Sequence, residues 1–253
     1  MAHPLGIVVP AYEPDVGRLE RYLHALHDRL TPATVRIELD APDDATLDAV
    51  RALPAEVNAV PARRGKGAAV TAGFEALDTD RLCFLDADGS TPPDAAAAVV
   101  DALDDADLAV GSRRHPDAQV VGHQTVARRL LGDGFAWVAR RLLDAQLYDY
   151  QCGAKALTAE TWTAVRDHLY EPGFAWDVEL VAMAAALGFR LREVPIEWED
   201  APGSTVDPID TALDMTRALF VVRRRAKRLN DSRLHGALAA GSESVALVER
   251  GEP

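Results

Sequence analysis

The sequence predicts an α/β fold in which a largely parallel mixed sheet is flanked by helices on both faces. Short apolar runs alternate with amphipathic segments along the first half of the chain, and this alternation is typical of strands joined by helices. At 253 residues, 48% of them hydrophobic, the chain can bury a substantial core. No internal repeat or linker is visible, so we expect one domain over residues 1–229 and a flexible polar tail over residues 230–253.

In the first half, strands are expected where apolar residues run between turn residues, and helices where apolar residues recur at helical spacing. The expected strands are Leu5–Val9, Val35–Leu39, Val57–Pro61, Leu82–Asp86 and Leu108–Val110. The expected helices are Val16–Leu30, Ala45–Leu53, Gly67–Leu77 and Pro93–Leu103. Residues 111–124 are polar and patternless, which predicts a mobile loop.

The second half contains fewer strands. Its expected helices are Thr125–Leu143, Ala159–His168, Asp177–Leu187 and Ile209–Leu229, and its expected strands are Ala154–Leu157 and Phe189–Val194. The last helix ends in a basic cluster made of Arg223, Arg224, Arg225, Lys227 and Arg228. Apolar and basic side chains on one helix are typical of a helix at an anionic membrane surface. A core-packed helix with a solvated basic end has the same pattern.

Composition and charge exclude several classes of protein. The formal net charge of −13 argues against nucleic-acid binding. No segment approaches the ~20 apolar residues that span a bilayer, and the chain begins with a strand rather than a signal peptide, so we expect a cytoplasmic protein. Cys83 and Cys152 are too few for a disulfide framework. The acidity and the scarcity of lysine are typical of salt-loving microbes; a GC-rich genome would explain the arginine and alanine alone.

Two carboxylates mark the end of the fourth expected strand. Asp86 and Asp88 flank Ala87 and precede a Gly/Pro-rich segment, so strand alternation would point both toward one side. Ligands bind open α/β sheets at this carboxyl edge. Mg²⁺ is commonly held by one or two carboxylates together with substrate phosphates. The pair therefore predicts a metal site for a nucleotide diphosphate, although such a pattern taken alone is more often a solvated turn.

Other residues at strand and helix ends are candidates for nucleotide contacts. Tyr12 follows Pro10 at the end of the first strand, where its ring could stack on a base. Asp40 ends the second strand and could accept hydrogen bonds from base N–H groups or form an Asx turn. Lys66 lies in a Gly-Lys-Gly helix start, which favours an anion such as a diphosphate. A plain strand-end aromatic and a plain helix start are the alternatives.

Taken together, these segments resemble the family 2 glycosyltransferases of the polyprenyl-phosphate type, which include dolichyl-phosphate glucosyltransferases and mannosyltransferases. The matching segments follow the family's order between Leu5 and about Leu229. The early ones are residues 10–12 (Pro-Ala-Tyr), Asp40, 65–70 (Gly-Lys-Gly-Ala-Ala-Val), 86–89 (Asp-Ala-Asp-Gly) and 111–113 (Gly-Ser-Arg). The later ones are residues 149–155 (Asp-Tyr-Gln-Cys-Gly-Ala-Lys), 174–180 (Phe-Ala-Trp-Asp-Val-Glu-Leu) and 193–198 (Glu-Val-Pro-Ile-Glu-Trp). Residues 149–155 and 177–180 resemble the lipid-phosphate branch in particular.

The resemblance implies a single-domain glycosyltransferase A fold and inverting transfer of a hexose to a polyprenyl phosphate, with Asp88, Arg113 and Asp177 as the catalytic residues. It implies Mg²⁺ or Mn²⁺ at Asp86 and Asp88. The implied nucleotide contacts are Pro10, Tyr12, Glu13, Asp40, Lys66 and Ala87. The acceptor phosphate is assigned to Arg113 with Arg128 or Arg129, because arginine forks suit phosphate. The implied sugar pocket consists of Gln151, Lys155, Trp176 and Asp177.

UDP-glucose is the expected donor and GDP-mannose the second choice, because residues 86–91 and 174–180 resemble the glucosyl branch more closely. The sequence departs from the family pattern at Leu39-Asp40, at Glu13-Pro14 and at Ala62 or Arg63, where the family has asparagine. These departures bear on the identity of the nucleotide base more than on the reaction class. Weak peripheral membrane association, or a membrane partner protein, would bring the enzyme to a lipid acceptor.

The role of Asp177 separates this function from the alternatives. A phosphate acceptor is largely ionised at neutral pH, so Asp177 is expected to order the site rather than act as a base, and it could also cap the following helix. Two other functions stay open. One is transfer to a soluble or protein hydroxyl acceptor with Asp177 as general base, and the other is non-catalytic binding of a nucleotide sugar.

Overall fold

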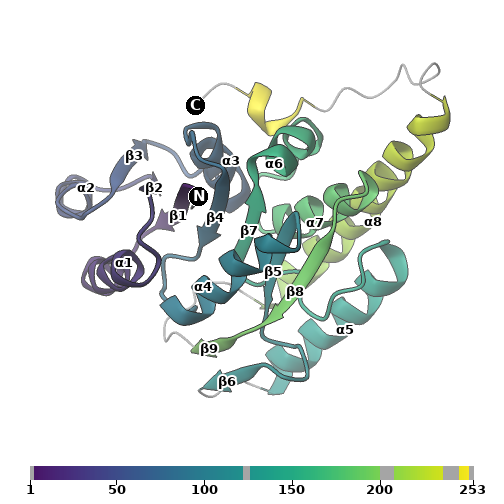
Figure 1. Ribbon diagram of the computed structural model, residues 1–253, viewed down its shortest axis with the longest axis horizontal. Coiled ribbons are helices and arrows are strands. Elements are labelled where there is room, and N and C mark those ends of the chain that lie inside the picture. The colour runs from purple at the N-terminus through teal and green to yellow at the C-terminus, as the bar shows by residue number, and fades with distance from the viewer. Residues whose placement is uncertain (1–2, 122–125, 200–207, 236–244, 251–253) are drawn as a thin grey trace.

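The computed structural model describes residues 3–121, 126–199, 208–235 and 245–250, and it confirms the predicted α/β class (Figure 1). Its main sheet has seven strands in the order β3-β2-β1-β4-β7-β5-β8. Neighbouring strands run parallel except at β7, which is antiparallel to both β4 and β5. The sheet is therefore mixed and largely parallel, as predicted.

Every strand and helix expected from the sequence has a counterpart. The strands are β1 Leu5–Tyr12, β2 Thr34–Asp40, β3 Glu56–Val60, β4 Arg81–Leu85, β5 Leu108–Ser112, β6 Gln119–Val121, β7 Ala154–Thr158, β8 Leu191–Pro195 and β9 Glu197–Glu199. The helices are α1 Val16–Leu30, α2 Asp44–Arg51, α3 Lys66–Glu75, α4 Pro93–Asp101, α5 Val126–Leu142, α6 Ala159–Val165, α7 Trp176–Ala186 and α8 Pro208–His235. Short 3₁₀ turns occur at Ala102–Asp104, Arg166–His168 and Leu247–Glu249.

Helices cover both faces of the sheet, and each face has its own hydrophobic core. Ile7 and Val9 of β1 pack with α1, α2 and α4, whereas Val8 packs with α3, α7 and α8. Successive side chains of a strand point to opposite faces, so a strand covered on both sides is apolar at every position. Full burial of one such side chain contributes roughly 1.5–3 kcal/mol. Side-chain caps begin α1, α2 and α6; at α1 the carboxylate of Asp15 accepts a hydrogen bond from the N–H of Arg18 at 3.0 Å.

A second, two-stranded sheet formed by β6 and β9 was not predicted. Residues 119–121 pair in parallel with residues 197–199, and the two strands lie side by side below the main sheet in Figure 1. Strands of three residues are too short for a period-two pattern to be recognised. The expected mobile loop over residues 111–124 is therefore wrong for residues 119–121.

The end of the chain also differs from the flexible tail expected beyond residue 229. Helix α8 continues to His235. Farther along, Ala246 and Leu247 are buried, and the N–H of Leu247 donates to the carbonyl of Leu169 at 2.8 Å. Residues 245–250 thus pack on the domain, because a pair of apolar residues in a polar segment is enough to dock it.

Candidate active site

The strand order brings the predicted residues to one edge of the sheet. β1, β2 and β4 run parallel, so Tyr12, Asp40 and Asp86 all lie at or just beyond the carboxyl ends of their strands. β7 is antiparallel to β4, so its start lies at the same edge. Glu13 and Ala41, which follow β1 and β2, both have φ of 48°. This backbone conformation is uncommon for residues other than glycine and is concentrated at functional sites.

Two lysines and two aspartates form a connected network at this edge. Nζ of Lys66 lies 2.9 Å from Oδ1 of Asp86 and 3.0 Å from Oδ2 of Asp177. Oδ1 of Asp177 lies 2.5 Å from Nζ of Lys155, which also donates to the carbonyl of Cys152 at 2.9 Å. Lys155 is fully buried and Asp177 is 2% exposed, so these charges are neutralised by one another rather than by water.

The network shifts the pKa of Asp177 and of Lys66. Burial alone would raise the pKa of Asp177, but the ammonium groups of Lys155 and Lys66 outweigh burial and hold this pKa below its ordinary value. Burial alone would lower the pKa of Lys66, but Asp177 and Asp86 outweigh it and raise this pKa. Asp177 is therefore an ionised carboxylate with both oxygens engaged, which makes it a weak proton acceptor.

The Asp86-Ala87-Asp88 segment forms a turn after β4 rather than the end of the strand. β4 ends at Leu85, and Oδ1 of Asp88 accepts a hydrogen bond from the N–H of Ser90 at 2.9 Å. Strand alternation therefore does not set the orientation of the two carboxylates, contrary to the expectation from sequence. Turn geometry and the contact with Lys66 hold them instead.

Gly153 makes room for the first of these carboxylates. The N–H of Asp86 donates to the carbonyl of Gly153 at 3.0 Å, and a Cβ on Gly153 would overlap the carboxylate of Asp86. Among the described residues, no group of three or more His, Cys, Asp or Glu side chains is arranged to hold a metal. The donor set of Asp86 and Asp88 fits Mg²⁺ or Mn²⁺, which can take further oxygens from phosphate and water.

Asp40 anchors the loop that leads into α3. Its Oδ2 accepts hydrogen bonds from the N–H groups of Arg64 at 2.8 Å and Gly65 at 3.0 Å, and its Oδ1 accepts one from Nε of Arg64 at 2.8 Å. The same guanidinium lies 2.9 Å from the buried carboxylate of Glu38. Both oxygens of Asp40 are thus engaged within the chain, and its contact with a base stays a prediction.

Tyr12 keeps an accessible ring at the end of β1. It is 39% exposed, and the guanidinium carbon of Arg63 lies 4.1 Å from the ring centroid, at the distance of a cation–π contact. Glu13 beside it is exposed, whereas Pro10 and Ala87 are half-buried. The structure therefore leaves Tyr12 and Glu13 open to a ligand, and stacking on a base stays a prediction.

Arg113, at the end of β5, is oriented by a buried carboxylate. Its Nε lies 2.7 Å from Oδ2 of Asp149 and its NH2 lies 3.1 Å from Oδ1, which is a two-point pair. Its guanidinium carbon lies 5.5 Å from the ring centroid of Trp198. The carboxylate of Glu193 accepts a hydrogen bond from the backbone N–H of Asp149 at 2.8 Å, so the backbone of Asp149 is itself held in place.

Helix α5 contains the other two arginines predicted for the acceptor phosphate. The side chains of Arg128 and Arg129 lie outside the described part of the structure. Arg114, which the sequence did not indicate, pairs with Asp133 of α5 at 2.5 Å. A Cβ on Gly132 would overlap the guanidinium of Arg114. Arg114 therefore ties the loop after β5 to α5.

Comparison with known proteins identifies the family. The profile described as "Glycosyl transferase family 2" matches residues 6–147, which include β1 to β5 and the Asp86-Ala87-Asp88 turn. The chain belongs to glycosyltransferase family 2. It is thus a glycosyltransferase, as the motifs predicted.

Curated relatives of this glycosyltransferase include enzymes named for lipid-phosphate acceptors. It is 29% identical over 240 residues to a dolichyl-phosphate beta-glucosyltransferase of Drosophila melanogaster, covering 86% of this chain and 74% of the relative. It is 31% identical over 200 residues to an undecaprenyl-phosphate mannosyltransferase of Micrococcus luteus, covering 76% and 82%. It is 30% identical over 224 residues to the glycosyltransferase AglD of Haloferax volcanii, covering 83% of this chain but only 35% of that relative.

Solved structures confirm the fold of this glycosyltransferase. Glucosyl-3-phosphoglycerate synthase from Mycobacterium tuberculosis, crystallised with Mn²⁺, UDP and phosphoglyceric acid, matches with a TM-score of 0.66 over 89% of this chain and 79% of that one. The same synthase has been crystallised with Mg²⁺ and UDP. At 18% identity the likeness shows the fold alone, and that fold is the predicted glycosyltransferase A type.

The four residues predicted for the sugar pocket of this glycosyltransferase occupy different environments. Lys155 and Asp177 belong to the network, and Gln151 is half-buried, with its N–H donating to Asp149 at 3.0 Å. Trp176 is fully buried, and its Nε1 donates to Oγ1 of Thr71 at 3.0 Å. Trp176 therefore packs in the core beneath the network, which corrects the expectation that it lines the pocket.

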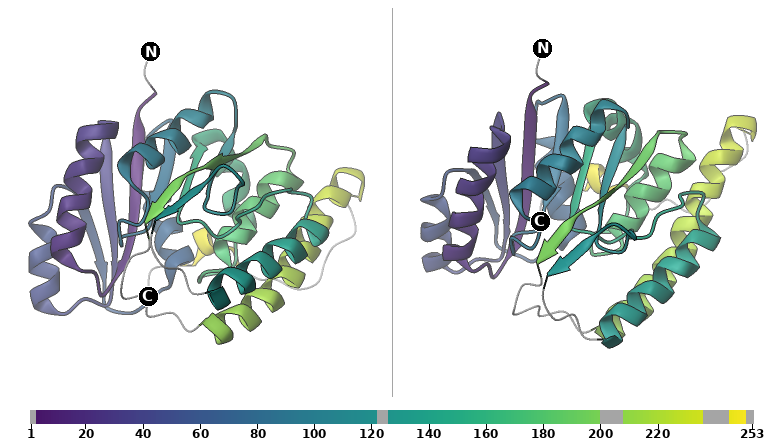
Figure 2. Two further views of the ribbon diagram at one scale, coloured as in Figure 1. Left: turned by 90° about the horizontal axis from the view of Figure 1, so that it is seen from below. Right: turned by 60° about the horizontal axis from the view of Figure 1, so that its bottom comes forward.

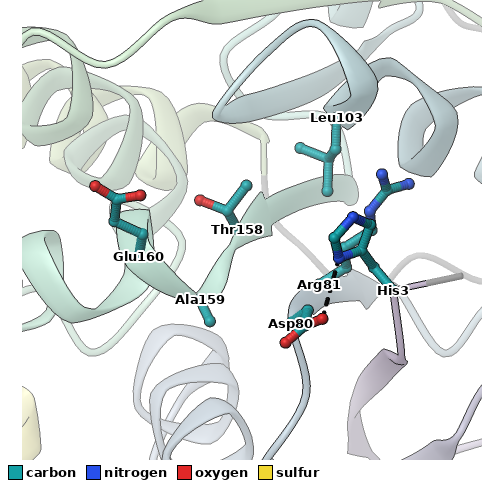
Figure 3. Close-up of a pocket in the computed structure, with 7 residues that line it drawn as sticks. All are labelled: His3, Asp80, Arg81, Leu103, Thr158, Ala159 and Glu160. Carbon is teal, nitrogen blue, oxygen red and sulfur yellow. Dashed lines mark hydrogen bonds and ion pairs between the residues drawn. The ribbon is translucent and has the colours of Figure 1, made fainter. Parts of the chain in front are cut away.

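A pocket elsewhere in this glycosyltransferase does not coincide with the candidate site (Figure 3). It has a volume of about 280 Å³. Its lining residues are His3, Asp80, Arg81, Leu103, Thr158, Ala159 and Glu160. β4 begins at Arg81 and the antiparallel β7 ends at Thr158, so this pocket lies at the opposite edge of the sheet. It contains none of the predicted site residues.

The Arg113–Asp149 pair predicts a pH-dependent contribution to stability. Burial disfavours the ionised form of Asp149, but Arg113 outweighs it and lowers the pKa to about 2, against about 3.9 in an unfolded chain. A depressed pKa stabilises the fold above the unfolded value, and this contribution is lost as the pH falls toward the folded value. Between about pH 5 and pH 2, we expect the free energy of unfolding in urea to fall by on the order of 2 kcal/mol more in the wild type than in Asp149→Asn. Equal pH dependence of the two proteins would contradict this.

Proposed function

We propose that this glycosyltransferase transfers a hexose, with inversion, from a nucleotide diphosphate sugar to a polyprenyl phosphate. UDP-glucose is the favoured donor and GDP-mannose the second. The observation that carries the proposal is Asp177, whose two carboxylate oxygens are paired with Lys66 and Lys155. A hydroxyl acceptor needs a base, which this carboxylate is poorly placed to provide. A phosphate acceptor is already ionised and needs none. The names of the curated relatives support the same acceptor class.

Asp86 and Asp88 are the residues that would hold Mg²⁺ or Mn²⁺. Such an ion, when bound, neutralises charge on the departing diphosphate. Lys66, between Asp86 and Asp177, would bind the diphosphate at the start of α3, where backbone N–H groups also favour an anion. Asp177 and Lys155 would keep Lys66 in place and border the hexose.

Arg113 would hold the acceptor phosphate, together with Arg128 or Arg129. Asp149 engages Nε and NH2 of Arg113, and a guanidinium has five N–H donors, so donors remain for a phosphate. Orientation of the guanidinium by Asp149 and Trp198 reduces the freedom that it would lose on binding. The attacking oxygen could thereby be held in line with the anomeric carbon.

The proposed reaction is tested by incubating the protein and MnCl₂ with UDP-glucose or GDP-mannose and a dispersed polyprenyl phosphate. We expect a lipid-linked hexose that is absent when the corresponding polyprenol replaces the phosphate. The product should also depend on the divalent cation and disappear with EDTA. Transfer to soluble hydroxyl acceptors without any lipid product would overturn the proposal in favour of base-assisted transfer. Nucleotide-sugar binding without turnover would favour the non-catalytic alternative.

The surface of α5 and α8 supports weak membrane association, directly or through a membrane partner protein. The two helices lie side by side in both views of Figure 2, and Nε of Arg223 donates to the carbonyl of Leu142 at 3.1 Å. Among the side chains of these helices that the structure describes, the large exposed apolar ones are Trp137, Phe220 and Val221, and the exposed basic ones on α8 include Arg217, Arg224, Lys227 and Arg228. In the described part of the chain, no helix is long and apolar enough to cross a membrane. Flotation with anionic vesicles tests this surface; a Trp137→Ser/Phe220→Ser variant that floats as well as the wild type would contradict its role.

A further inference from the structure

Glu179 is a buried carboxylate to which the proposed reaction assigns no role. It lies in α7 two residues after Asp177 and is fully buried. Residues two apart do not share a face of a helix, so Glu179 points away from the lysines that hold Asp177. Its Oε2 accepts hydrogen bonds from the N–H groups of Tyr170 at 2.7 Å and Glu171 at 2.8 Å. Its partners are thus the backbone of the loop that precedes α7.

Arg225 of α8 completes the contacts of this carboxylate. Its NH1 lies 2.6 Å from Oε1 of Glu179 and 3.0 Å from Oε1 of Glu171. Its guanidinium carbon lies 4.5 Å from the ring centroid of Tyr170. A buried carboxylate is costly unless it is paired and hydrogen-bonded. Here two hydrogen bonds, one ion pair and one cation–π contact reach residues 170–171, and the Arg225–Glu179 ion pair joins the two helices. Glu179 and Arg225 therefore clamp residues 170–171 from two helices.

The clamped loop supports the start of α3. The carbonyl of Pro172 accepts a hydrogen bond from the N–H of Ala68 at 3.0 Å. A Cβ on Gly65 would lie 2.7 Å from that carbonyl oxygen, and a Cβ on Gly67 would lie 2.5 Å from the carbonyl oxygen of Glu171. Both distances are too short for a side chain, so the two glycines around Lys66 allow the loop to approach. The backbone that carries Lys66 thus rests directly on residues 171–172.

We propose that Glu179 and Arg225 are positioning residues for the donor: they hold the 170–172 loop, and the loop fixes Lys66 where a diphosphate binds. This inference rests on the proposed function only in naming the diphosphate as the group that Lys66 meets. The claim that Glu179 and Arg225 position the start of α3 through the 170–172 loop rests on the contacts described above and not on the proposed function. It also explains why an acidic residue follows Asp177 at this spacing without taking part in the chemistry.

The test uses Arg225→Gln and Glu179→Gln in the full chain, with Arg225→Lys as the conservative variant. Arg166→Gln is the matched control, because it removes a comparable arginine–glutamate pair, to Glu75, at the opposite end of α3. Hydrogen exchange at the amides of residues 66–69 is expected to become at least ~10-fold faster in Arg225→Gln. It should be restored in part by Arg225→Lys and unchanged in Arg166→Gln.

A second measurement addresses the donor site. The Kd for UDP with Mn²⁺ is expected to rise by about 5–20-fold in Arg225→Gln, an effect of ordinary coupling size, with KM for the donor rising more than kcat falls. Unchanged exchange at residues 66–69 would overturn the inference, as would faster exchange with an unchanged Kd. Should Glu179→Gln fail to fold, Arg225→Gln, whose side chain is partly exposed, still decides the question. If the wild type binds no nucleotide, the proposed function fails while the exchange measurement still decides the positioning role.

Discussion

Asp88→Asn is expected to lower kcat/KM for hexose transfer by ~10²–10³-fold, because a metal ligand at a departing diphosphate contributes several kcal/mol. The melting temperature should change little. Oδ1 of Asp88 serves the turn by accepting the N–H of Ser90, and the side-chain oxygen of asparagine can do the same. The substitution therefore removes the charge and keeps the fold of the turn. Steady-state kinetics over a range of MnCl₂ concentrations, together with a thermal melt, measure both effects.

Asp94→Asn is a suitable control for this experiment. Asp94 lies in α4 close to Asp88 in sequence, and its carboxylate is exposed and pairs with Arg29, so its loss should leave kcat/KM unchanged. Higher MnCl₂ should recover part of the activity of Asp88→Asn if the weakened step is metal binding. Full activity of Asp88→Asn at limiting metal would show that this carboxylate holds no ion.

The fold could be predicted because helices on both faces make the central strands apolar along their whole length. Strand β1 illustrates both the strength and the limit of this prediction. The apolar run predicts a strand to Val9, but β1 continues to Tyr12 although Pro10 lacks an N–H. Proline is tolerated there because β1 pairs with β4 only from Leu5 to Val8, so one side of Pro10 has no ladder to interrupt. Such a local gap in pairing is invisible in the sequence.

The residues of the site could be named from sequence more readily than their contacts. Lys66, Asp86, Lys155 and Asp177 each belong to a recognisable motif, but the pairing of Lys155 with Asp177 depends on β7 lying between β4 and β5. Antiparallel insertion of one strand is a topological choice that no local pattern encodes. The placement of Lys155 beside Asp177 therefore appears only in the folded chain.

Residues that support the site from behind gave weaker signals. Arg64 lies 24 positions from Asp40 in sequence, yet its backbone N–H and its Nε both donate hydrogen bonds to the carboxylate of Asp40. No sequence pattern near either residue indicates this pairing. Gly153 belongs to a motif that the sequence shows. The reason for a glycine there is that a side chain would overlap the carboxylate of Asp86, and this close approach is visible only in the folded chain. The sequence thus identifies the residues that would contact a ligand more readily than the residues that hold them in position.

Asp177→Asn is expected to destabilise the fold by about 3–5 kcal/mol, because it leaves buried ammonium groups without their carboxylate. Lys155 is fully buried and would keep its hydrogen bond to the carbonyl of Cys152 and its contact with the ring of Phe84 but no carboxylate, whereas Lys66 keeps Asp86. For a chain of this size the loss corresponds to roughly 6–20 °C in melting temperature. The double variant Asp177→Asn/Lys155→Met should recover part of it, since both buried charges are then removed.

The same substitution separates the two acceptor chemistries. A general base would be revealed by a loss of ~10²–10⁴-fold in turnover together with disappearance of the acid limb of the pH–rate profile. If Asp177 instead orders Lys66 and Lys155, the substitution should raise KM for the donor. The shape of the pH–rate profile of the folded fraction should then stay unchanged. We expect the second result, because the pKa of Asp177 lies below its ordinary value and both its oxygens are paired. A wild-type melting temperature combined with a lost acid limb would assign Asp177 as the base and redirect the search to hydroxyl acceptors.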